Sequence, residues 1–156
     1  PLDADTFDFS GDNVGMVQQL IVKKGEPSLV RPAGDTQKGF FFLSNLDQNL
    51  AVTVKTIYSF KSDTKGNEDA AKVIKEALAK VLVHYFPVAG RIIVTPEGKL
   101  GIDCTAEGAV FVEADADGDF SDLGTMKNSD PIRLGSLVYE FPDAQDVLQI
   151  PPLIVQ

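Results

Sequence analysis

The clearest pattern in the sequence is an apolar stripe that recurs at helical spacing within residues 67–91. Its apolar positions are Ala70, Ala71, Ile74, Ala77, Leu78, Val81, Leu82 and Tyr85, and its polar positions are Glu68, Asp69, Lys72, Lys75, Glu76 and Lys80. Asn67 suits the N-cap, because its side-chain oxygen can accept from a free amide of the first turn. Pro87 lacks an amide hydrogen, so we expect a long packed helix over residues 68–85, or ending one residue earlier, and then a turn at 89–90.

The strongest strand pattern covers residues 51–60 (AVTVKTIYSF), where β-branched and aromatic residues dominate. Alternation places Val52, Val54, Thr56, Tyr58 and Phe60 on one face and Thr53, Lys55, Ile57 and Ser59 on the other. A strand at 91–95, a turn at 96–98 and a strand at 100–104 predict a hairpin, and 109–114 predicts one more strand. The chain therefore predicts an α/β fold in which a helix packs across a mixed sheet.

The other stretches carry weaker patterns. Residues 1–15 contain four Asp and show no period, which predicts a flexible leader before a domain at 16–156. Before the main strand pattern we expect a strand at 16–24, an extended crossing segment at 25–38, and a buried short strand or packed turn at 40–47. After the predicted strand at 109–114 we expect an acidic turn-rich stretch at 115–130, a short helix or strand at 131–140, and a Pro-Asp turn within 141–149. Residues 151–156 predict a loop opening a buried strand, and a strand without a terminator suggests a truncated chain.

Composition narrows the class of protein. With 156 residues and 44% hydrophobic content, the chain can bury the core of one domain or of a large piece of one. A formal charge of −9 without a basic cluster argues against nucleic-acid binding, and no apolar run reaches the ~20 residues of a membrane span. Cys104 is the only cysteine and no glycosylation sequon occurs, which favours a cytoplasmic location.

Few residues offer catalytic or metal chemistry. His84 is the only histidine, and its place before Pro87 favours a structural role at the end of the helix. Cys104 lies in an alternating strand, where a small core residue is expected rather than a reactive thiol. Residues 113–124 partly match a calcium loop, but Gly124 stands where the bidentate Glu belongs, so a solvated acidic loop is preferred. No phosphate-binding glycine motif and no GxSxG motif is present, and no metal site is predicted.

Four blocks resemble a known family. Residues 43–47 (LSNLD), 56–58 (TIY), 82–91 (LVHYFPVAGR) and 102–114 (IDCTAEGAVFVEA) resemble, in order and spacing, the opening part of plant BAHD acyl-CoA-dependent acyltransferases. The resemblance covers about residues 16–156. LSNLDQN and PEGKL are most similar to the hydroxycinnamoyl (feruloyl) transferases that act on ω-hydroxy fatty acids and fatty alcohols.

The resemblance implies a two-domain fold of the chloramphenicol-acetyltransferase type, with acyl donor and acceptor entering a channel between the domains. In this family the His of an HxxxD motif deprotonates the acceptor hydroxyl, and a downstream DFGWG motif is structural. Neither motif occurs here: His84 is followed by Val88 where Asp would be required. No catalytic residue is therefore assigned to this chain, which we expect to be truncated before HxxxD and inactive alone.

Thr56 and Tyr58 are the candidate substrate-binding residues, because the resemblance places this strand against the aromatic group of the acyl donor. The alternative is a hydroxyl and an aromatic on a half-buried strand. The resemblance also implies acyl-CoA as a co-substrate, no tightly bound cofactor, and partners limited to donor, acceptor and the remainder of the fold. A non-catalytic domain that binds an aromatic acyl group or a partner chain is the competing hypothesis, and exposed apolar surface would favour self-association or poor solubility.

Overall fold

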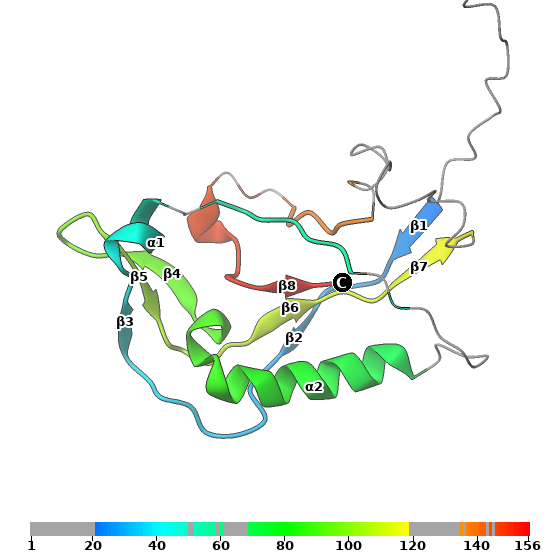
Figure 1. Cartoon of the computed structure of the whole chain (residues 1–156), viewed down its shortest axis with the longest axis horizontal. Coiled ribbons are helices and arrows are strands. Elements are labelled where there is room, and N and C mark those ends of the chain that lie inside the picture. The colour runs from blue at the N-terminus through cyan, green and yellow to red at the C-terminus, as the bar shows by residue number, and fades with distance from the viewer. Residues whose placement is uncertain are drawn as a thin grey trace, which may run out of the picture.

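The computed structural model describes residues 21–49, 52–58, 60, 69–118, 135, 137–142, 144 and 146–156. The described part is a mixed α/β fold with three small sheets and one long helix, α2 (Ala70–His84), which lies along one side of the molecule (Figure 1). The α/β class is therefore confirmed. The predicted leader at 1–15, the predicted N-cap Asn67 and acidic residues 119–130 lie outside the described residues.

A bent antiparallel ribbon forms two of the sheets. At one end β1 (Ile21–Lys24) pairs with β7 (Ala114–Asp117), and further along β2 (Ser28–Val30) pairs with β6 (Ala109–Phe111). At the bend the Gly25 amide donates to the Glu113 carbonyl oxygen at 2.7 Å. β8 (Ile154–Val155) then joins β6 in parallel, which gives the strand order β2–β6–β8.

This ribbon corrects two predictions. Residues 109–114 are not one strand, because the chain bends at residues 112–113 between β6 and β7. The crossing segment at 25–38 contains β2, which the Pro and Gly residues around it concealed. The predicted strand at 151–156 is present as β8, although its two residues are only half-buried.

The third sheet contains the predicted hairpin. β4 (Arg91–Val94) pairs with β5 (Leu100–Asp103), and Gly98 has a positive φ of 75° in the turn between them. β3 (Phe40–Phe42) pairs with the other edge of β5. The prediction that this segment is buried is wrong: Phe42 is 80% exposed, because no element in the described part covers the outer face of this edge strand.

A short helix, α1 (Asn45–Asn49), follows β3 and is fixed by its side chains. Ser44 and Asp47 form a reciprocal capping box, in which each side chain accepts from the backbone amide of the other. Gln48 exchanges two hydrogen bonds of 2.7 Å with the backbone of Leu100 at the start of β5. The Gln48 side chain thus takes the place of a strand partner and holds α1 against the hairpin.

The strongest predicted strand is wrong in the structure. Residues 52–58 form no ladder, and each of them is exposed. Ala51 and Ser59 lie outside the described residues. Strand propensity measures how well a residue fits a half-buried pleated surface, and a strand also needs a neighbouring strand that supplies hydrogen bonds. No described segment supplies that neighbour.

The long helix is present but packs less completely than its pattern predicts. It ends at His84, and Pro87 lies within a 3-10 turn, η1 (Phe86–Ala89), that leads into β4. Leu78 and Leu82 are its buried side chains, and Leu82 is fully enclosed. They join a core contributed by β2, β6 and η1, made of Val30, Leu78, Leu82, Ala89, Ala109 and Phe111.

Candidate functional site

The candidate substrate-binding residues lie on an accessible stretch of chain. Thr56 is exposed and Tyr58 is 78% exposed, so a ligand or another part of a protein could contact both side chains. The prediction that they share one strand face presupposes a strand, which residues 52–58 do not form. Their assignment to substrate binding stays a prediction.

One ion pair ties this stretch to a segment far along the chain. Lys55 directly precedes Thr56 in the sequence, and its ammonium group contacts the Glu140 carboxylate. Hydrogen bonding to Lys55, followed by the positive charge of Lys55, holds the pKa of Glu140 below its ordinary value. Both side chains are well exposed, so the pair contributes little stability and positions the segment instead.

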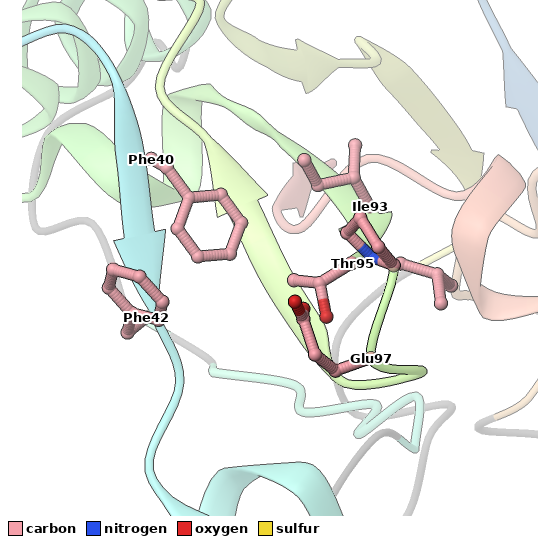
Figure 2. A pocket seen from close by; sticks show the side chains of 7 residues that line it. Phe40, Phe42, Ile93, Thr95 and Glu97 are labelled. Atoms are coloured by element: carbon pink, nitrogen blue, oxygen red, sulfur yellow. The ribbon is translucent and has the colours of Figure 1, made fainter.

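A separate apolar hollow of about 430 Å³ lies on the third sheet. Figure 2 shows Phe40 of β3 pointing toward Ile93 and Thr95, and Phe42 and Glu97 also line the hollow. The two aromatic rings meet edge to face, with centroids 4.5 Å apart. Thr56 and Tyr58 are not among the residues that line this hollow, so the structure does not bring the sequence-derived candidates together with it.

The Phe40 ring occupies space that a side chain at position 101 would need. A β-carbon added at Gly101 would lie 2.0 Å from the ring, so the glycine allows Phe40 to lie across β5. The run of three phenylalanines suggested burial, so the sequence did not reveal this hollow. The available signal was that alternate residues of a strand face opposite ways, so Phe40 and Phe42 share one face.

His84 lacks the surroundings of a general base. It is the exposed last residue of α2. Val88, at the position where HxxxD requires Asp, packs against the apolar core. An apolar side chain cannot orient an imidazole through a hydrogen bond, so His84 and Val88 do not form a catalytic pair.

Cys104 is a core residue, as predicted. Its side chain is 4% exposed, and burial, followed by the charge of Asp103, raises the pKa of the thiol. Raising the pKa lowers the fraction of reactive thiolate at neutral pH.

The acidic run differs from the predicted loop. Asp115 and Asp117 belong to β7 and pair with Lys23 and Ile21 of β1, so the first half of the proposed calcium loop is a strand. Within the described ranges, no cluster of three or more His, Cys, Asp or Glu side chains is arranged to hold a metal ion. In the same part of the chain, no helix combines the length and apolar character needed to cross a bilayer.

The sequence profile of the Transferase family matches residues 20–156, which is most of the chain. The chain therefore belongs to the Transferase family, as its resemblance to the BAHD acyltransferases predicted.

Curated relatives add detail. The chain is 51% identical over 155 residues to the omega-hydroxypalmitate O-feruloyl transferase of Arabidopsis thaliana, a match that covers 99% of this chain and 33% of the relative. It is 49% identical over 140 residues to the fatty alcohol:caffeoyl-CoA acyltransferase of the same plant, covering 88% of this chain and 33% of the relative. The benzyl alcohol O-benzoyltransferase of Nicotiana tabacum is 38% identical over 138 residues, covering 86% of this chain and 30% of the relative. The chain thus spans about a third of the length of these relatives.

Proposed function

We propose that these residues belong to an acyl-CoA-dependent O-acyltransferase that moves a feruloyl-type group from coenzyme A to the hydroxyl of an ω-hydroxy fatty acid or fatty alcohol. This proposal rests on how the sequence identity to this chain differs among the relatives. The two relatives named for feruloyl or caffeoyl groups and fatty acceptors are 51% and 49% identical, whereas the benzoyltransferase is 38% identical. The same resemblance supports a two-domain fold of the chloramphenicol-acetyltransferase type, of which residues 16–156 form an amino-terminal part.

The general base of this reaction is not within the 156 residues. In the proposed reaction a histidine removes the acceptor hydroxyl proton, and the oxygen attacks the thioester carbonyl and expels the coenzyme A thiolate. His84 and Val88 do not supply this motif. The role proposed for this stretch is to form the framework and part of the donor site, with Thr56 and Tyr58 contacting the aromatic end of the acyl group.

A chimeric enzyme tests the proposal. The 156 residues replace the matching third of the Arabidopsis feruloyl transferase, and transfer from feruloyl-CoA to ω-hydroxypalmitate is measured by chromatography. The chimera is expected to form the ester, and the 156-residue chain alone is expected to form none. Transfer by the chain alone would contradict the assigned mechanism, and a folded but inactive chimera would contradict the assigned function.

A substitution in the same chimera tests the site. Tyr58→Ala is expected to raise the KM for feruloyl-CoA roughly tenfold, which corresponds to ~1.4 kcal/mol and is typical of a lost aromatic contact. Thr53→Ala, at an exposed position of the opposite predicted face, is the control and should leave KM unchanged. Equal KM values for both variants would remove Tyr58 from the site.

The competing function is a non-catalytic domain that binds an aromatic acyl group. The observation in its favour is that the 156 residues lack the HxxxD motif. Calorimetry with ferulate separates the two functions. Tight binding by the chain alone, together with an inactive chimera, would favour the binding domain, because an incomplete acyl channel should bind weakly.

A further inference from the structure

A short segment near the end of the chain, residues 137–140, is held by side chains from two different sheets. The Lys24 ammonium group, at the end of β1, donates to the Val138 carbonyl oxygen at 2.8 Å. The Gln156 side-chain amide, directly after β8, donates to the Leu137 carbonyl oxygen at 2.6 Å. Strand pairing fixes the backbones of β1 and β8, so these two hydrogen bonds restrain the segment that they contact.

Glu140 extends from this segment to the Lys55 ammonium group. In Figure 1 the traces of residues 52–58 and 137–142 run close together, as this contact requires. The hydrogen bond from Lys55 is the largest cause that lowers the pKa of Glu140, followed by the charge of Lys55 and then, more weakly, by the charge of Lys24. Glu140 is therefore ionised at neutral pH, and the contact is a charged pair.

Residues 52–58 need such an anchor, because strand pairing with a described segment does not hold them. Thr56 directly follows Lys55, and Tyr58 lies three residues after Lys55, a span of at most about 10 Å. The Lys55–Glu140 pair therefore limits how far both side chains can move. The pair does not cover them, since Thr56 is exposed and Tyr58 is 78% exposed. Both side chains remain open to a ligand.

We propose that Lys55 is a positioning residue for acyl-donor binding, which acts through its ion pair with Glu140 to hold Thr56 and Tyr58 against the aromatic end of the donor. This inference rests on the proposed function, because that function assigns Thr56 and Tyr58 to the donor site. A pair that contributes only to stability is the alternative. The two roles differ in their effects, because positioning affects binding of the donor alone, whereas lost stability affects every substrate.

A double-mutant cycle in the chimera tests this role. The variants are Lys55→Met, Glu140→Gln and the two combined, with Lys55→Arg as the conservative variant that keeps the positive charge. Each is measured for the KM of feruloyl-CoA, the KM of ω-hydroxypalmitate, kcat and the melting temperature. Lys80→Met is the matched control for attraction of the anionic donor, because it removes the same charge from an exposed position on α2.

The expected result is specific to the donor. Each single variant of the pair should raise the KM of feruloyl-CoA about threefold, which corresponds to ~0.65 kcal/mol and is typical of an exposed ion pair. The combined variant should raise it by the same factor rather than roughly ninefold, because the pair is lost only once. Lys55→Arg and Lys80→Met should leave it unchanged. The KM of ω-hydroxypalmitate and kcat should stay constant, because the aromatic end of the donor contributes binding energy only.

Three results in an active chimera would overturn the positioning role alone. The first is a KM of feruloyl-CoA that Lys55→Met leaves unchanged. The second is a roughly ninefold rise in the combined variant, since the two side chains would then act separately. The third is an equal rise in the KM of both substrates, together with a lower melting temperature, which would assign the pair to stability.

Calorimetry with feruloyl-CoA gives the same comparison as a Kd and needs no turnover. An inactive chimera that binds feruloyl-CoA about threefold more weakly with Lys55→Met would refute the proposed function and leave the positioning role intact. An inactive chimera whose Kd does not respond to Lys55→Met, or that does not bind feruloyl-CoA, would overturn both.

Discussion

Gly108 and Gly39 have nearly the same left-handed backbone, with φ of 108° and 107°, but different surroundings. A β-carbon at Gly108 would lie 2.3 Å from the carbonyl oxygen of Val30, whereas one at Gly39 would meet nothing within 4 Å. The pair therefore separates the cost of backbone conformation from the cost of close packing between strands.

We expect Gly108→Ala to destabilise the protein more than Gly39→Ala. Both variants carry the strain of a positive φ, roughly 1–3 kcal/mol, and the clash with a backbone atom should add roughly 1–3 kcal/mol at Gly108. Urea unfolding of the two variants measures the difference. Equal free energies of unfolding would mean that β2 can move away from Gly108 at no cost.

The Lys55–Glu140 pair should respond to pH in one direction. Because the pKa of Glu140 is lowered in the folded chain, the stabilisation by the pair is complete above the ordinary carboxyl pKa and is lost as the pH falls through the lowered value. An NMR titration of Glu140 should give a midpoint below 4.5, and Lys55→Met should raise it. A midpoint that Lys55→Met leaves unchanged would contradict the ion pair.

At the scale of the elements, α2 shows that an apolar residue of a helix is not always buried. Leu82 and Val81 are consecutive apolar residues of one helix, yet Leu82 is 0% exposed and Val81 is 47% exposed. Leu82→Ala should cost about 2–5 kcal/mol of unfolding free energy, because it leaves a cavity in the core. Val81→Ala should stay within roughly 0.5 kcal/mol. Thermal or urea unfolding checks both, and similar losses would contradict the described packing of the helix.

The elements predicted correctly are those whose signals are local. The end of α2 before Pro87 and the hairpin around Gly98 follow from backbone restrictions that a single residue imposes. The strand at 51–60 and the burial of Phe40–Phe42 depend on partners far along the chain, which local patterns do not reveal. For the candidate site, Thr56 and Tyr58 were predicted by resemblance and stay a prediction, whereas the hollow of Phe40 and Phe42 emerged only from strand pairing.

At the scale of the whole molecule, charge opposes the association that exposed apolar surface favours. The formal charge is −9 at pH 7, and the pI is about 4.5. We expect light scattering to show the strongest association near pH 4.5, where repulsion vanishes and apolar surface is free to pair. Val81→Lys should reduce this association, and Glu76→Gln should not. Association that does not depend on pH would argue against an electrostatic control of solubility.

The parallel pairing of β6 with β8 affects the order in which the sheets can form during translation. Phe111 finds its partner Val155 only after the intervening residues have left the ribosome, whereas the hairpin of β4 and β5 can close as soon as Asp103 is free. Non-local pairing forms slowly because a long loop must close first. Among the described strands, the hairpin is therefore the first pair along the chain able to form during translation, and the sheet beside α2 is the last to be completed.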